Sequence, residues 1–264
     1  MSIKLPSFFT LDKNTLCFSK KHVKCVIVFM WCSTSCFGQG GNNLDAQTLD
    51  PAISTQPALV KQLIIPGLLT GTALLINNSS FERDLQPKIN KGLSTNIDDY
   101  TRFAPIAGMY LADGLGIPSK NHWFDQTKNA AFSLVITQLI TTGLKVNIDK
   151  DRPNGANNEA LPSGHTSLAF ASATVFYEEF KETKPLLAYS GYVFALSTAY
   201  LRMAKNKHWL SDVILGSAVG IAVTKLVYHL DHLFAWNPFV KSEKLVVFPN
   251  FGNGTTGLSL AFRF

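Results

Sequence analysis

The chain has 264 residues, 46% of them hydrophobic, which is enough for one large domain or two small ones. Residues 1–38 hold five lysines and one aspartate, and without them 19 cations (24 less 5) face 17 anions (18 less 1). Most of the formal net charge of +6 therefore lies in this leader, which argues against a nucleic acid as a partner.

The leader has the pattern of a secretory signal. Three lysines precede the apolar run Val26–Trp31, and the small residues Cys36 and Gly38 precede Gln39. This order is typical of a signal peptide, residues 1–38, cleaved after Gly38. An uncleaved membrane anchor is the main alternative, and a lipoprotein signal at Cys36 is disfavoured by Ser33. The sequence therefore predicts export to a bacterial-type cell envelope, in a periplasmic or membrane-associated form.

Residues 39–56 are polar and are interpreted as a linker, whereas residues 57–234 show the apolar periodicity of helices. Small residues are frequent in this region, and they let neighbouring helices approach closely. The sequence predicts an all-α domain of six helices, at Pro57–Ile76, Tyr100–Leu115, Asp125–Val146, Gly164–Phe180, Lys184–Met203 and His208–Phe234.

The tail, residues 235–264, changes its period. Leu245–Phe251 and Leu258–Phe264 are short apolar or alternating runs on either side of a glycine-rich segment. This pattern predicts a β-hairpin. Because one hairpin cannot close a membrane barrel, we expect it to pack on the helical body.

Hydropathy leaves open whether the helices cross a membrane. A spanning helix needs about 20 mostly apolar residues, and the best candidate, Leu63–Ile76, has 14. If Gln39 lay outside and every predicted helix spanned, Lys145 and the motifs described next would face the cytoplasm, which is odd for an exported protein. The sequence therefore favours a periplasmic helical body associated with a membrane.

Three short blocks of charged and polar residues lie at the ends of the predicted helices. In the block Pro162-Ser163-Gly164-His165, Ser163 or Gly164 is placed to cap a helix. The N–H groups and partial positive charge of a helix N-terminus bind phosphate, and glycine lets the backbone approach an anion. His165 could then protonate a leaving oxygen. The alternative is an ordinary cap followed by a surface histidine.

In the block Arg202-x5-His208-x3-Asp212, His208 and Asp212 are four residues apart and share one face of a helix. A carboxylate on one imidazole nitrogen leaves a lone pair on the other and stabilises a cationic ring. His208 is then a candidate nucleophile and Asp212 its orienting group. The alternative is a surface ion pair, which contributes little.

The block Lys145-x6-Arg152-Pro153 adds two cations to Arg202. Arginine matches phosphate oxygens with a planar fork, and lysine supplies a point charge. Three cations on one phosphoryl group would neutralise its oxygens, so neither a metal nor another cofactor is expected. A metal site at His229 and His232 would need further ligands. All four cysteines lie in residues 1–38, which leaves no thiolate ligand for the rest of the chain.

Together the blocks resemble the type 2 phosphatidic acid phosphatase (PAP2) superfamily, which includes class A acid phosphatases and vanadium haloperoxidases. The family pattern is K-x6-R-P, P-S-G-H and S-R-x5-H-x3-D, and the chain departs from it only at Leu201, where the family usually has serine. The resemblance covers roughly Pro57–Leu233. It implies a six-helix bundle with the active site between helix ends.

The resemblance also implies a function, namely metal-independent hydrolysis of a phosphomonoester or diphosphate of an envelope lipid. His208 would form a phosphohistidine, Asp212 would orient it, and His165 would protonate the leaving group. The partner would be a phosphorylated lipid or a small phosphate ester. The residues implied to bind the phosphate are Lys145, Arg152, Ser163, Gly164 and Arg202.

Other functions stay open at this stage. A soluble periplasmic acid phosphatase of broad specificity would use the same residues. A vanadium-dependent haloperoxidase could hold vanadate, which mimics the phosphoryl transition state, with the same cations. A non-enzymatic envelope protein is disfavoured, because every group needed for the chemistry is present.

Overall fold

The computed structural model describes residues 59–234, 236–239, 245–252 and 255–262. Regular structure between residues 59 and 234 is helical apart from one isolated bridge between Lys150 and Glu159, which confirms the all-α class. The proposed signal peptide and linker, residues 1–56, lie outside the described residues. The helices are α2 (Leu59–Ile76), α3 (Ser80–Ile89), α4 (Ile97–Thr101), α5 (Ala104–Gly114), α6 (Trp123–Asn147), α7 (Gly164–Phe180), α8 (Pro185–Ala204), α9 (Leu210–His229) and the 3-10 turn η2 (Asp231–Phe234).

Two of the predicted helices are divided. The helix expected at Tyr100–Leu115 is split, because α4 ends at Thr101 and a new helix begins at Ala104, with Pro105 in its first turn. Proline suits a first turn, where its missing N–H has no intrahelical acceptor. The last expected helix ends at His229 and is followed by the separate turn η2.

The short helix α3 was not predicted. Its N-cap is Ser79, whose hydroxyl accepts a hydrogen bond from the N–H of Glu82 at 3.2 Å. This is a common way to satisfy a free donor at a helix start. It follows a single left-handed residue, Asn78, so the chain turns sharply out of α2 into α3.

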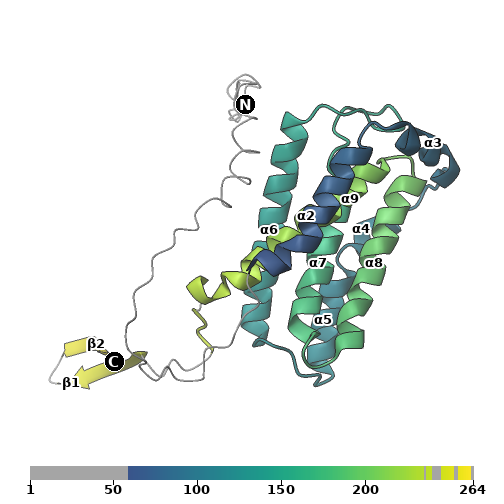
Figure 1. The fold of residues 1–264 in the computed structure, drawn as a ribbon. Coiled ribbons are helices and arrows are strands. Elements are labelled where there is room, and N and C mark those ends of the chain that lie inside the picture. Colours follow the sequence, from purple (N-terminus) through teal and green to yellow (C-terminus); the bar gives the residue numbers. More distant parts are fainter. Residues whose placement is uncertain (1–58, 235, 240–244, 253–254, 263–264) are drawn as a thin grey trace, which may run out of the picture. The chain divides into compact units, whose positions relative to one another are not determined.

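Helix α7 is the central element of the bundle. It contacts α5, α6, α8 and α9, and nearly all of its side chains are buried. Figure 1 shows α6 and α8 on either side of it. Small residues permit this arrangement: a Cβ on Gly220 of α9 would lie 2.8 Å from the N atom of Ala171 and closer still to the carbonyl of Ser167. The two helices therefore cross with their backbones nearly in contact.

The outward faces of the bundle are apolar and part of its interior is polar. Helices α2, α6 and α8 expose large apolar side chains, for example Leu75 (84%), Leu139 (67%) and Val193 (62%). Two helices, α2 and α9, are long and apolar enough to cross a membrane, and α9 is mostly buried. An apolar outer surface around a partly polar interior is the reverse of the arrangement usual in soluble proteins. The buried face of α6 carries Gln126, Asn129, Ser133, Thr137 and Thr141.

In the tail, β1 (Leu245–Gly252) and β2 (Thr255–Phe262) pair antiparallel, with Leu245 opposite Phe262 and Gly252 opposite Thr255. The packing of this segment on the helical body stays a prediction.

Candidate active site

The three sequence blocks meet at one end of the bundle. Lys145 is in the last turn of α6, Gly164 opens α7, Arg202 is in the last turn of α8, and Asp212 is in the first turn of α9. The N–H of Ser163 donates to the carbonyl of Asp212 at 2.9 Å. A Cβ on Gly164 would lie 3.9 Å from Cε of Lys145. Alternating helix directions therefore bring together residues that are far apart in the chain.

His208 is buried, and its tautomer follows from one hydrogen bond. Its Nδ1 lies 2.9 Å from the carbonyl oxygen of Ala160. A carbonyl can only accept, so Nδ1 carries the hydrogen and Nε2 keeps its lone pair. The nearest oxygen of Asp212, the predicted orienting group, is 3.5 Å from Nδ1. The carbonyl reaches the ring more closely.

Asp212 is held mainly by other donors. Its Oδ2 accepts from the N–H of Trp209 at 2.8 Å, and its Oδ1 accepts from Nζ of Lys150 at 2.8 Å. The carboxylate still stands beside the imidazole of His208, so its negative charge acts on the ring. The Trp209 contact requires α9 to begin just after His208, as it does.

The surroundings of His208 keep it neutral. Burial lowers the pKa of the imidazole to about 4, against the opposing effect of the Asp212 carboxylate. The positive charges of Arg202 and Lys145 lower the pKa further. At neutral pH the ring is therefore uncharged.

Two arginines offer unpaired donors. Nε of Arg152 and Nε of Arg202 are buried and have no hydrogen-bond partner in the part of the chain that the structure describes. Buried donors are rarely left without a partner, so both are available to an acceptor bound at this end of the bundle. The loop that carries Arg152 is tied to the region of His208, because the indole N–H of Trp209 donates to the carbonyl of Asp151 at 2.8 Å.

Arg202 is held by a carboxylate that sequence analysis did not identify. Its Nη1 donates to Oδ2 of Asp98 at 2.7 Å, and Lys205 donates to Oδ1 of Asp98 at 2.7 Å. Burial alone would raise the pKa of Asp98, but the hydrogen bonds and charges of Lys205 and Arg202 lower it to about 2. Asp98 is therefore ionised and fixes Arg202 from behind.

A further cation, Lys207, was also missed. Burial lowers its pKa, and the positive charges of Arg202, Lys205 and Arg152 lower it further. Lys145, which sequence analysis did identify, donates to the carbonyl of Glu159 at 2.6 Å. The site end of the bundle is thus rich in positive charge.

His165 lies in the first turn of α7 and is paired with α4. Its Nε2 is 2.7 Å from Oδ1 of Asp99, and this hydrogen bond lowers the pKa of the Asp99 carboxyl. The carboxylate accepts, so Nε2 carries a hydrogen. Sequence analysis did not identify Asp99 as the partner of His165. The one feature of the sequence that could have indicated it is the adjacent pair of carboxylates, Asp98 and Asp99.

Ser163 and Gly164 form the start of α7, as predicted. Ser163 is the N-cap, and its hydroxyl accepts from Thr166 at 2.9 Å. The first N–H groups of an α-helix have no intrahelical acceptor. They are therefore available to an oxyanion beside Gly164, close to Lys145.

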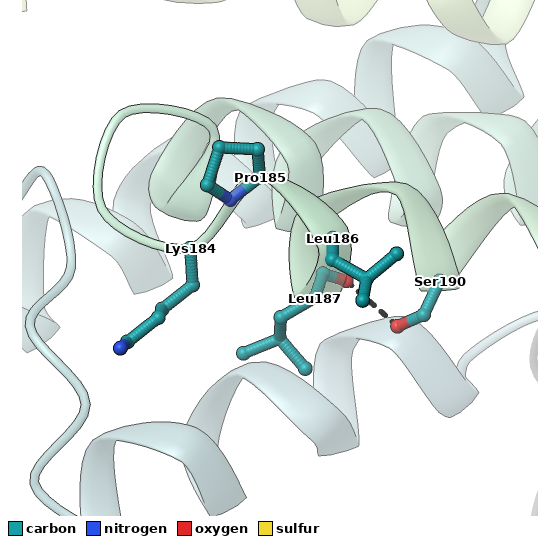
Figure 2. Close-up of a pocket in the computed structure, with 5 residues that line it drawn as sticks. All are labelled: Lys184, Pro185, Leu186, Leu187 and Ser190. Atoms are coloured by element: carbon teal, nitrogen blue, oxygen red, sulfur yellow. Dashed lines mark hydrogen bonds between the residues drawn. The ribbon is translucent and has the colours of Figure 1, made fainter.

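A surface hollow lies at the other end of α8. Figure 2 shows its lining, Lys184, Pro185, Leu186, Leu187 and Ser190. The Ser190 hydroxyl donates to the carbonyl of Leu187 at 2.7 Å. This hollow lies at the start of α8, at the opposite end from Arg202, and its lining includes no imidazole or carboxylate. It is therefore separate from the cluster around His208. Among the described residues, no group of three His, Cys, Asp or Glu could hold a metal ion.

Comparison with known proteins identifies the family. Residues 126–236 match the model of the PAP2 superfamily. The chain contains a PAP2 superfamily domain. The matched range holds all three sequence blocks, including Lys145, His165 and His208, and its helices are those that form the site end.

Two curated relatives are similar to this chain. It is 30% identical over 179 residues to the lipid A 1-phosphatase of Porphyromonas gingivalis, which covers 67% of this chain and 40% of the relative. It is 24% identical over 113 residues to sphingomyelin synthase-related 2 of Caenorhabditis elegans, covering 43% of this chain and 34% of the relative. The chain thus spans less than half the length of the curated relatives it matches.

Two solved structures are also similar. LpxE of Aquifex aeolicus shares 20% identity with a TM-score of 0.44, over 58% of this chain and 98% of that one. A transmembrane PAP2 type phosphatidylglycerolphosphate phosphatase of Bacillus subtilis shares 18% identity with a TM-score of 0.40, over 69% of this chain and 96% of that one.

Proposed function

We propose that the chain is a metal-independent phosphatase that hydrolyses a phosphate group of an envelope lipid through a phosphohistidine at His208. One observation carries the proposal. A neutral imidazole with a free Nε2 lies at the helix ends that also hold Arg152 and Arg202, whose buried Nε atoms lack partners. A phosphoryl group supplies the anion that these donors need, with its phosphorus open to the ring nitrogen.

The reaction follows from this geometry. The lone pair of Nε2 of His208 attacks phosphorus, and the bond from phosphorus to the leaving oxygen breaks. Burial and the positive charge of Arg202 lower the pKa of His165 to about 4, against the hydrogen bond to Asp99. The protonated form of His165, a minority at neutral pH, gives its proton to that oxygen. A water molecule then attacks the phosphohistidine with His165 as base, releasing inorganic phosphate and neutral His208. Throughout, the phosphate oxygens are held by Lys145, Arg152, Arg202, Ser163 and Gly164.

A lipid is favoured as the source of the phosphate. The matched relative of Porphyromonas gingivalis is named for a lipid A phosphate. The exposed apolar faces of α2, α6 and α8 would be costly in water over so wide an area. We therefore propose that the bundle lies in a membrane, with the site end at one surface, where a lipid headgroup can enter. A domain at residues 57–234, preceded by a signal and a linker and followed by a tail, stays part of this proposal.

The test is phosphate release by the purified full chain in detergent micelles, with a chelator present. The substrates are a panel of lipid phosphates and one short soluble ester. We expect release from a lipid phosphate, and a loss of at least about 10³-fold in kcat for His208→Ala, because removing a nucleophile removes the covalent route. His232→Ala, in the turn η2, is the matched control and should stay active.

The outcomes separate the alternatives. Release from the soluble ester alone would favour a broad acid phosphatase. Halide oxidation that needs added vanadate, without phosphate release, would favour a haloperoxidase. Full activity in His208→Ala would overturn the phosphohistidine route.

A further inference from the structure

A buried ammonium lies against the carboxylate of Asp212. Nζ of Lys150 donates to Oδ1 of Asp212 at 2.8 Å and to the hydroxyl of Ser211 at 2.6 Å, and it lies 3.3 Å from Oε2 of Glu82. An ammonium has three N–H donors, and these three acceptors use them all. Only 4% of the Lys150 side chain is exposed, so water has little access to it.

Glu82 reaches this group from α3. Its Oε1 accepts from the N–H of Ser211 at 2.7 Å and from the Ser211 hydroxyl, and its Oε2 accepts from the N–H of Asn78 at 3.0 Å. The Glu82 side chain is 1% exposed. Two buried carboxylates, Glu82 and Asp212, thus share one ammonium. Without that ammonium, one of them would take up a proton more readily.

The charges around His208 make the ionisation of Asp212 important. The positive charges of Arg202 on α8 and Lys145 on α6 act on the ring, and Asp212 is the negative group beside it. When Nε2 bonds to phosphorus, the ring becomes positively charged. A protonated Asp212 would leave that charge among cations.

We propose that Lys150, together with Glu82, is a positioning residue for the nucleophile, which keeps Asp212 ionised and fixed beside His208. Neither Lys150 nor Glu82 forms a hydrogen bond with His208, and they act through Asp212. The inference rests on the proposed phosphatase function. It explains why a lysine is buried between the two phosphate-binding cations of the first block, Lys145 and Arg152.

The experiment compares four variants with the wild type in detergent micelles: Lys150→Met, Lys150→Arg, Glu82→Gln and the double variant Glu82→Gln/Lys150→Met. The readouts are kcat and KM for a phosphate substrate from pH 4 to 8, and thermal unfolding. Lys181→Met is the matched control, because it removes a lysine 2.6 Å from Glu178 at the far end of α7 and should leave the rate unchanged.

In Lys150→Met we expect kcat to fall at least about tenfold with little change in KM, because the phosphate-binding cations remain. The acid limb of the pH profile should move upward by about one pH unit or more, since a carboxylate takes up a proton more readily. Lys150→Arg should recover much of the rate. The double variant removes one charge of each sign, so its acid limb should return toward that of the wild type while kcat stays low, because Asp212 lacks its donor.

Several outcomes would overturn the positioning role. One is Lys150→Met with the rate and pH profile of the wild type. If Lys150→Met does not fold, the double variant decides, and a wild-type rate there would show that Lys150 only balances charge. Failure of the proposed phosphatase function can be distinguished from failure of the positioning role, because in that case the wild type itself releases no phosphate.

In that case the imidazole signals of His208, followed by NMR through a pH titration, test the positioning role without activity. Lys150→Met should raise the pH at which the pair of His208 and Asp212 takes up a proton, and Lys181→Met should not. An unchanged titration would contradict the inference.

Discussion

His208 shows how the surroundings of a single residue set its charge state and its tautomer. A histidine in water has a pKa near 6.5, and about half of it would be protonated at that pH. Burial lowers the pKa to about 4, so the ring is neutral and Nε2 has a lone pair over most of the pH range. The carbonyl of Ala160 decides which nitrogen that is.

The pH dependence of kcat/KM tests this description. In the proposed mechanism His208 must be neutral to attack. We therefore expect protonation of His208 in the free enzyme to reduce kcat/KM only as the pH drops toward about 4. An acid limb of kcat/KM near pH 6.5 that belongs to His208, and that substitutions of other residues do not remove, would show that the ring is solvated rather than buried.

Linkage gives the matching expectation for stability. The pKa of His208 is lower in the folded state than in the unfolded chain, so protons bind the unfolded chain more tightly. The free energy of unfolding should then decrease as the pH falls from about 6.5 to about 4. His208→Gln should lose that part of the pH dependence, as measured by thermal unfolding.

At the scale of elements, the crossing of α7 and α9 sets the distance between the sequence blocks. Gly216 and Gly220 face α7, and a Cβ on Gly216 would lie 2.7 Å from the carbonyl of Ser163. Because Ser163 caps α7 and Asp212 lies in the first turn of α9, this close crossing places the turn that we propose to bind phosphate next to the carboxylate beside His208.

Gly220→Ala should therefore force α7 and α9 apart. We expect a loss of about 1–3 kcal/mol in the free energy of unfolding, as for other overpacked contacts, together with reduced phosphate release. Thermal unfolding in detergent micelles measures the first. Gly71→Ala in α2 is the control, because a Cβ there meets nothing within 4 Å and alanine favours the helix. Equal stability of the two variants would mean that the crossing is looser than described.

At the scale of the whole molecule, the distribution of apolar surface indicates whether lipid or water surrounds the helical bundle. The faces of α6 and α8 that point outward are apolar, while α6 turns Asn129, Ser133 and Thr137 inward. In lipid, small and polar residues pack helices together and apolar side chains face the acyl chains. The sequence favoured a periplasmic body, and this arrangement argues for a membrane-embedded one.

Introducing a charge on an outward face distinguishes a lipid environment from an aqueous one. In lipid, Leu139→Lys should cost about 2.5–3.5 kcal/mol of insertion and reduce the amount of chain in the membrane fraction after alkaline extraction. In water, the same exposed position should tolerate lysine within about 0.5 kcal/mol. Asn147→Lys, exposed at the end of α6, is the control and should behave as the wild type. Full solubility of the wild type without detergent would contradict the membrane proposal.

The sequence by itself determined where most of the long helices lie, and it predicted which side chains would carry the chemistry. Local rules suffice for that: apolar periodicity predicted six helices, and the turn at Ser163 and Gly164 predicted the start of α7. Neighbours along one helix, such as His208 and Asp212, could be paired by spacing alone. The spacing did not reveal that a carbonyl 48 residues away holds the ring more closely.

Only the tertiary structure decided the partners. Asp98 meets Arg202 across 104 residues, Lys150 meets Asp212 across 62, and Glu82 meets Ser211 across 129. Such pairs follow from how helices cross and which ends they share, and no local spacing encodes that. For the same reason, the sequence did not show whether lipid or water covers the outer faces. A helix such as α6 has apolar and polar faces in any environment, and packing alone decides which face points inward.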